Sequence, residues 1–122
     1  MGVIASTLGF IQTFWKAITV LLLLVITLLS LYPLPALPEV PGADKTHHLI
    51  AYGFLAFPAA LKGPNKLTIL LLCFVAFGGL IELIQPYVNR YGEWLDFVAN
   101  TAGVALGTAI GTYWKHKLTA IA

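Results

Sequence analysis

The sequence predicts an all-α protein whose helices cross a membrane, and three observations support this class. Hydrophobic residues make up 59% of the 122 positions, and charged residues make up only 10%. Soluble domains average about 45–50% apolar and about 25% charged residues. The mean hydropathy is +0.88, and the apolar residues gather in four stretches separated by polar or proline-containing segments. The chain is therefore predicted to form one domain, residues 1–122, built as a four-helix transmembrane bundle.

The first predicted helix covers about residues 10–32. Residues 17–32 contain no charged side chain, and a spanning helix needs about 20 apolar residues. Lys16 can extend its amine to the membrane surface, so we expect the helix to continue back through Phe10 and Phe14. A cleaved signal peptide is the alternative. It is disfavoured because no Ala-x-Ala-like cleavage site follows the run and only Lys16 supplies positive charge before it.

The second predicted helix covers about residues 44–61. Four prolines within residues 32–42 precede it, and they favour a loop because proline lacks the amide proton that helices need. Asp44 opens the helix, since its short carboxylate can cap the free amides of a helix start. Because the stretch is short and has Pro58 near its end, a tilted or partly interfacial course fits it as well as a full span.

The third predicted helix covers about residues 67–85 and follows a turn at residues 62–66, whose Lys-Gly-Pro-Asn-Lys composition is typical of turns. Its apolar run is about as long as a bilayer core is thick. Glu82 lies in its last turn, and Pro86 ends it.

The fourth predicted helix covers about residues 94–114, after a polar turn. Asp96 and Asn100 occupy its first turns, and a Lys-His-Lys sequence follows Trp114. These basic residues place the end of the helix in water, and the last residues to Ala122 are expected to fray.

The distribution of lysines predicts how the bundle is oriented. Four spans put both termini and the 62–66 turn on one side of the membrane. That side carries five lysines and no acidic residue, whereas the other side carries one lysine, one arginine and all five acidic residues. Cytoplasmic loops carry an excess of basic residues. We therefore expect an N-in, C-in, multi-pass protein of the inner (cytoplasmic) membrane, with the lipid bilayer as its first partner.

Polar side chains from three segments are predicted to gather on the outer side, where the second and fourth helices start and the third ends. Ionisable groups at membrane depth are rare because hydrocarbon cannot solvate them, and they usually mark function. Asp44, His48 and Tyr52 are spaced by four residues and share a helix face, as Glu82 and Gln85 do at a spacing of three. The candidate site residues are Asp44, Lys45, His48, Tyr52, Glu82, Gln85, Arg90, Asp96 and Asn100.

Each ionisable candidate has a structural and a chemical interpretation. Glu82 and Asp96 either form a hydrogen-bonded pair that holds the helices together or share a proton, act as acid and base, or bind a cation. His48 is either an interfacial histidine or a general base or ligand. Arg90 contacts either lipid phosphate or an anionic ligand, for which its planar fork is suited. His48, Glu82 and Asp96 are therefore the catalytic candidates.

A stripe of glycines continues below the polar residues of the fourth helix. Asp96, Asn100, Gly103, Gly107 and Gly111 follow one another at steps of 4, 3, 4 and 4, which keeps them on one helix face. Small residues let a neighbouring backbone approach closely. We expect the neighbour at Gly78 and Gly79 of the third helix, and packing between two copies, as a homo-oligomer, is the alternative.

Several classes of function have no support in the sequence. A net charge of +2 without a basic run offers no electrostatic basis for binding nucleic acid. Cys73 is the single cysteine, so neither a disulfide framework nor a cysteine metal motif is present. His48, Glu82 and Asp96 are suitable ligand types, but no metal-binding spacing joins them. We therefore predict no metal and no cofactor, and no hydrolase, phosphate-loop or zinc-protease motif occurs.

Four short segments together resemble the VanZ-like family of small bacterial membrane proteins. They are DKTHHLIAY at residues 44–52, IELIQ at 81–85, Arg90, and DFVANTAGVALG at 96–107. The chain departs from the family pattern at residues 91–93, where a serine-containing segment commonly follows the arginine. The resemblance implies a multi-pass protein of the bacterial cell envelope, and the family's namesake is associated with resistance to the glycopeptide antibiotic teicoplanin.

The leading functional hypothesis is a cell-envelope membrane protein that binds or modifies a polar or anionic ligand at the outer face. The sequence is compatible with both catalysis on such a ligand and binding alone. A transporter or a proton or ion pathway is the first alternative, but inward from Glu82 the third helix offers only Thr68, Cys73 and glycines as polar or small groups. The second alternative is a structural assembly module held by the glycine stripe.

Overall fold

The computed structural model describes residues 2–32, 43–88 and 93–121, and the side chains of residues 43 and 44 lie outside the description. In chain order the elements are α1 (Gly2–Thr13), α2 (Trp15–Leu31), α3 (Ala43–Lys62), α4 (Leu67–Ile84), the 3-10 helix η1 (Gln85–Val88) and α5 (Trp94–Ile121). No strand occurs in these ranges. The all-α class is therefore confirmed for the described residues.

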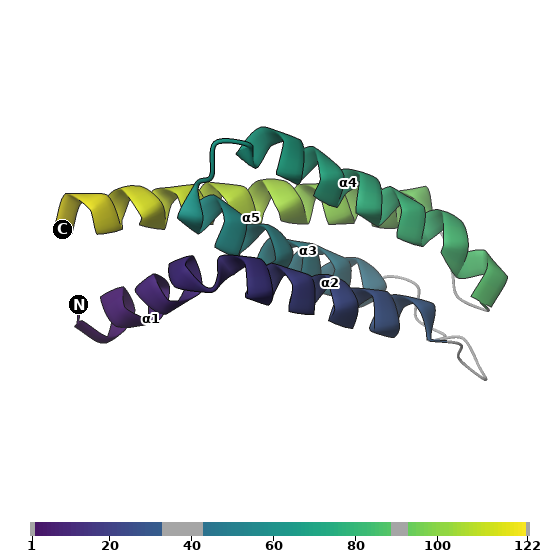
Figure 1. Ribbon diagram of the computed structural model, residues 1–122. Helices are drawn as coiled ribbons and strands as arrows, with labels where there is room; N and C mark the ends of the chain where they lie inside the picture. Colours follow the sequence, from purple (N-terminus) through teal and green to yellow (C-terminus); the bar gives the residue numbers. More distant parts are fainter. Residues whose placement is uncertain (1, 33–42, 89–92, 122) are drawn as a thin grey trace.

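The helices form a bundle with α3 at its centre (Figure 1). α3 packs along α5 more extensively than any other pair of described helices. The two run parallel, since Lys45 lies beside Asp96 at one end and Gly63 lies beside Lys115 at the other. α2 and α4 run in the opposite direction, so the beginning of α5 and the end of α4 meet at the same end of the bundle (Figure 1).

The apolar core lies midway along the bundle and takes side chains from four helices. α3 contributes most of it, because Tyr52, Leu55, Ala56 and Ala59 are at most 1% exposed. Side chains of α2, α4 and α5 complete the core: Ile26, Phe74 and Val104. Alanines on α3 leave room for a close neighbour, so α5 can approach the α3 backbone directly.

The glycine stripe of α5 packs against α3, and not against Gly78 and Gly79 as the sequence had suggested. A Cβ atom added at Gly107 would lie 2.9 Å from the Cα atom of Gly53, and one added at Gly111 would lie 2.8 Å from the carbonyl oxygen of Phe57. Only glycine permits such an approach of two backbones. The stripe therefore makes an internal contact of one chain.

The two glycines of α4 make room for side chains of α5 instead. A Cβ atom at Gly78 would lie 3.1 Å from Nδ2 of Asn100, and one at Gly79 would lie 3.2 Å from the ring of Phe97. α4 is thus separated from α5 by these side chains, whereas α3 and α5 touch through their backbones.

The expected continuous helix over residues 10–32 is broken at Phe14. α1 and α2 meet there at an angle of 77°, and the Phe14 backbone has φ −105° and ψ 23°. The Gln12 side chain donates a hydrogen bond to the carbonyl oxygen of Leu61 at 2.9 Å. The last carbonyls of a helix lack partners within it, so Gln12 satisfies one of them and ties α1 to the end of α3.

The other predicted boundaries agree with the structure except at the C-terminus. α3 and α4 begin and end within one residue of residues 44–61 and 67–85. α5 continues to Ile121 instead of fraying after Trp114. The added segment contains neither proline nor glycine, and the Thr119 hydroxyl donates to the Lys115 carbonyl at 3.0 Å within the helix.

Length and hydropathy distinguish one described segment as able to cross a membrane by itself. Leu67–Val88, which is α4 with η1, has 22 residues and a mean hydropathy of 2.5. α1 and α2 meet the same criterion only together, across their 77° bend. The helical class is therefore established for the described ranges, whereas four membrane spans stay a prediction.

Candidate functional site

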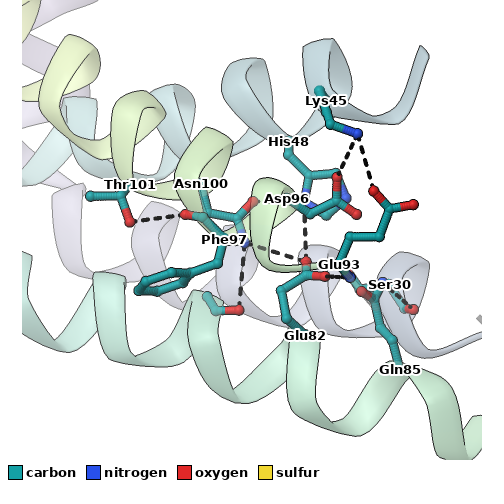
Figure 2. Close-up of polar contacts among 11 residues, drawn as sticks. Ser30, Lys45, His48, Glu82, Gln85, Glu93, Asp96, Phe97, Asn100 and Thr101 are labelled. Carbon is teal, nitrogen blue, oxygen red and sulfur yellow. Dashed lines mark hydrogen bonds and ion pairs between the residues drawn. The ribbon is translucent and has the colours of Figure 1, made fainter. Parts of the chain in front are cut away.

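Polar side chains from three helices meet where α3 and α5 begin and α4 ends (Figure 2). We call this set the polar cluster. α3 contributes two members, α4 contributes one, α5 contributes two, and one more lies directly before α5. The members are Lys45, His48, Glu82, Glu93, Asp96 and Asn100.

Asn100 lies at the centre of the polar cluster and is completely buried, with 0% exposure. Its Oδ1 atom lies 2.6 Å from Nδ1 of His48. An amide oxygen only accepts hydrogen bonds, so His48 carries its proton on Nδ1 in this contact. The Asn100 amide donates from Nδ2 to Glu82 Oε1 and to the Gly78 carbonyl, each at 3.5 Å. Asn100 thus connects α5 to both α3 and α4.

Glu82 joins the last turn of α4 to the other two helices. Its Oε1 atom lies 3.5 Å from Nδ1 of His48, and its Oε2 atom accepts a hydrogen bond from the backbone amide of Glu93 at 3.4 Å. The residue is only 7% exposed. Burying a carboxylate is costly unless it is paired and hydrogen-bonded, and these contacts supply partners to both oxygens.

Among the ionisable side chains of the polar cluster, carboxyl groups outnumber basic groups. Lys45 Nζ lies 3.3 Å from Glu93 Oε2 and 3.7 Å from Asp96 Oδ1. The Asp96 side chain is 3% exposed, whereas those of Lys45 and Glu93 are 33% and 40% exposed. Three carboxyl side chains, including that of Glu82, therefore lie close to one lysine and one histidine of the described residues. This arrangement favours a cationic or hydrogen-bond-donating ligand.

A cavity of about 310 Å³ adjoins the polar cluster between α2, α3 and η1. His48, Tyr52 and Gln85 give it a polar side, and Ile26 and Leu29 give it an apolar one. The Tyr52 hydroxyl and Gln85 Oε1 are buried and have no hydrogen-bond partner among the described residues. Buried polar atoms usually have a partner, so these two atoms mark a place suited to a bound polar group.

Tyr52 and Gln85 are positioned by contacts at the edge of the polar cluster. The Tyr52 ring lies parallel to that of His48, with ring centroids 6.5 Å apart. Gln85 Nε2 donates to the carbonyl oxygen of Ser30 at 3.1 Å, which ties η1 to the end of α2 (Figure 2).

A second cavity, of about 580 Å³, adjoins the polar cluster between α4 and the start of α5. Glu82 and Glu93 are its ionisable lining residues. The rest of its wall is mostly apolar and includes Leu80, Leu83 and Phe97. The buried carboxylate of Glu82 can therefore be reached from one cavity and the imidazole of His48 from the other.

Of the nine predicted site residues, the structure brings five into direct contact and puts two beside them. Lys45, His48, Glu82, Asp96 and Asn100 belong to the polar cluster, while Tyr52 and Gln85 line the adjoining cavity. The side chain of Asp44 and all of Arg90 lie outside the described residues.

Glu93 is a member of the polar cluster that sequence reasoning assigned to a turn. Its carbonyl oxygen accepts a hydrogen bond from the Asp96 amide at 3.0 Å, so it lies at the start of α5. An acidic residue directly before a predicted helix is the signal that would have drawn attention to it.

Comparisons of the chain with protein-family models, with curated proteins and with solved structures find no match. The fold and the polar cluster define an all-α protein with a buried, carboxylate-rich site at one end of its bundle. The resemblance to the VanZ-like family stays a prediction that rests on the four short segments.

Proposed function

We propose that this is an integral membrane protein of the bacterial cell envelope that binds a polar ligand through the polar cluster at its outer end, as the VanZ-like resemblance implies. The observation that carries the proposal is the convergence of three helices on buried polar side chains. Glu82, Asp96 and Asn100 are 7%, 2% and 0% exposed. Polar groups this buried in so apolar a chain are typical of functional sites.

The outer surface of the bundle supports a membrane environment. Large apolar side chains on α2 and α4 are each more than half exposed: Val20, Leu21, Leu24, Leu28, Ile69, Leu72, Leu80 and Leu83. Extended apolar surfaces of this kind mark membrane or protein contacts. In the proposed arrangement α2, α3, α4 and α5 span the bilayer with both termini in the cytoplasm. α1, bent away from α2, lies at the cytoplasmic interface.

The charges of the polar cluster indicate the chemistry of the ligand. The carboxyl oxygens of Glu82, Glu93 and Asp96 accept hydrogen bonds, so the described part of the site suits amine or hydroxyl donors. The predicted contact to an anion depends on Arg90, which lies outside the described residues. Both adjoining cavities have apolar walls. An amphipathic envelope molecule with donor groups on its polar part therefore fits best.

The apolar core supports binding over conduction. Below the polar cluster the bundle is filled by Leu55, Ala56, Ala59, Phe74 and Val104, which are 0–4% exposed. A proton or ion pathway requires polar groups or water along its length. Between the polar cluster and the predicted cytoplasmic end, Thr19 is the buried polar side chain among the described residues, and one hydroxyl does not make a continuous path.

Teicoplanin susceptibility provides the test. The protein is expressed in a susceptible bacterium, and we expect the minimal inhibitory concentration to rise above that of the empty vector. Glu82→Gln and Asp96→Asn remove a charge while nearly keeping side-chain shape, so each should return susceptibility to the vector level at normal membrane abundance. His116→Gln, at the far end of α5, is the control and should act as wild type.

Two results would count against this proposal. If wild-type protein leaves teicoplanin susceptibility unchanged, the implied resistance function is wrong. If both carboxylate variants raise the minimal inhibitory concentration as much as wild type does, the polar cluster is not responsible for the resistance.

A further inference from the structure

We propose that His48, Glu82 and Asp96 form a binding site for a divalent transition-metal ion, with Zn²⁺ as the best-fitting ion. Each residue offers one ligand atom, and these atoms all lie within 4.8 Å of one another. Ligands of tetrahedral zinc bind at about 2.0–2.2 Å and therefore lie about 3.4 Å apart. His48 Nδ1 and Glu82 Oε1 are 3.5 Å apart, which matches the distance between two ligand atoms of tetrahedral zinc.

The electrostatics of the polar cluster favour a divalent cation. Glu82 and Asp96 are both buried, at 7% and 2% exposure, and Lys45 is the described ammonium beside them, 3.7 Å from Asp96. Two carboxylates that are largely withdrawn from water are stabilised by a cation placed beside them. An ion between the two carboxylates neutralises both at once.

The kinds of ligand atom favour zinc over magnesium or calcium. Mg²⁺ and Ca²⁺ select oxygen ligands, whereas an imidazole nitrogen suits zinc and its transition-metal neighbours. Zinc binding at His48 Nδ1 requires the proton of the neutral imidazole to move to Nε2, by exchange with water, so that the Nδ1 lone pair faces the ion. Asn100 Oδ1, now 2.6 Å from that nitrogen, gives up this hydrogen bond when the proton leaves Nδ1.

The surroundings of the three ligands provide access and outer partners. His48 lines the cavity of about 310 Å³, and Glu82 lines the cavity of about 580 Å³, so an ion can enter from either side. The Tyr52 hydroxyl and Gln85 Oε1, both buried without a hydrogen-bond partner among the described residues, line the first cavity beside His48. Such atoms can hold the water ligands of a bound ion.

The sequence contains no local metal-binding spacing that joins His48, Glu82 and Asp96. Here the three ligands come from α3, α4 and α5, so no short motif contains them. The metal site shares residues with the proposed ligand site, but it rests on the geometry of the cluster and not on the envelope function. The two proposals can therefore fail separately.

Zinc binding to the purified full-length protein in detergent provides the test. After treatment with a chelator, the protein is titrated with zinc chloride in competition with a chromophoric chelator. We expect one zinc ion per chain, with magnesium chloride competing poorly. His48→Ala and Glu82→Gln should each weaken zinc binding at least about tenfold, since even outer-shell changes cost about 10–100-fold. His116→Ala, at the other end of the bundle, should bind as wild type.

Lys45→Gln provides a test with the opposite sign. Lys45 is the cation that now lies beside Asp96, so its removal should tighten zinc binding, whereas a purely structural lysine would leave it unchanged or weaken it. Zinc should also raise the unfolding temperature of wild-type protein and not that of His48→Ala. Circular dichroism and elution volume establish that each variant is folded.

The metal site would be disproved if wild-type protein bound no zinc above the level of His48→Ala. It would equally be disproved if His116→Ala lost as much affinity as His48→Ala, because zinc would then bind to surface histidines. If Glu82→Gln does not fold, His48→Ala and Lys45→Gln still decide the question. Neither result depends on teicoplanin susceptibility.

Discussion

Asn100 shows most clearly how a single residue organises the polar end of the bundle. Its amide is completely buried and lies between the imidazole of His48 and the carboxylate of Glu82. A buried amide in this position orients both groups, because it accepts from one and donates to the other.

The first residue-scale prediction concerns this amide. Asn100→Ala should lower the free energy of unfolding by about 1–3 kcal/mol, the usual cost of leaving buried polar groups without a partner. Thermal unfolding in detergent, followed by circular dichroism, measures the loss. The neighbouring variant Thr101→Ala is the control, since the Thr101 hydroxyl donates within its own helix to Phe97. An equal loss in both variants would contradict the role given to Asn100.

At the scale of elements, the parallel contact of α3 with α5 determines where the polar residues meet. Glycines at positions 103, 107 and 111 bring the α5 backbone against α3, and this contact fixes the register of the two helices. With that register His48 lies opposite Asn100 and Lys45 opposite Asp96. Close packing along the bundle and the geometry of the polar cluster are thus coupled.

Alanine substitutions at two glycines should affect stability differently. An added Cβ atom at Gly107 would lie within 2.9 Å of the Gly53 backbone, and backbone atoms cannot move aside as a flexible side chain does. Gly107→Ala should therefore destabilise the fold by about 1–3 kcal/mol, as overpacking does.

Gly9→Ala in α1 is the matched control, because an added Cβ atom meets nothing within 4 Å there. It should be neutral or stabilising, since alanine favours a helix over glycine by about 1 kcal/mol. Unfolding temperatures in detergent compare the two. Equal effects of the two substitutions would show that the contact between α3 and α5 is not tight in solution.

At the scale of the whole molecule, the sides of the bundle are apolar, one end holds the polar cluster and the other end carries lysines. Exposed leucines and valines cover α2 and α4, which suits a lipid surface. The lysines of the 62–66 turn and of the end of α5 gather at the opposite end from the polar cluster. Because basic residues favour the cytoplasmic side, the lysine end is predicted to lie in the cytoplasm and the polar cluster on the outer side of the membrane.

Cysteine labelling tests that orientation. In a Cys73→Ala background, Lys66→Cys places the only thiol of the chain at the turn between α3 and α4. A membrane-impermeant maleimide should label it only after the cells are opened, because the positive-inside rule places this turn in the cytoplasm. Labelling in intact cells would put the polar cluster on the cytoplasmic side and contradict an outer-face site.

Much of this structure could be predicted from local patterns. Apolar runs and proline-containing breaks predicted α3 and α4 closely, since hydrophobicity and missing amide protons act over short distances. The phase of Asp96 and Asn100 on α5, and their position near a helix start, correctly put them close to Glu82 and His48. The bend at Phe14 was missed because it depends on the contact of Gln12 with Leu61, 49 residues away.

The sequence by itself determined that the chain is helical, rich in exposed apolar surface, and polar at the helix ends that share one side. Only the tertiary structure decided which partners these groups take: the glycines of α5 face α3, Asn100 lies between His48 and Glu82, and Glu93 joins the polar cluster. The physical reason is that periodicity fixes the face of a helix on which a residue lies. Which helix packs on that face, and in which register, depends on backbone contacts between segments far apart in the chain.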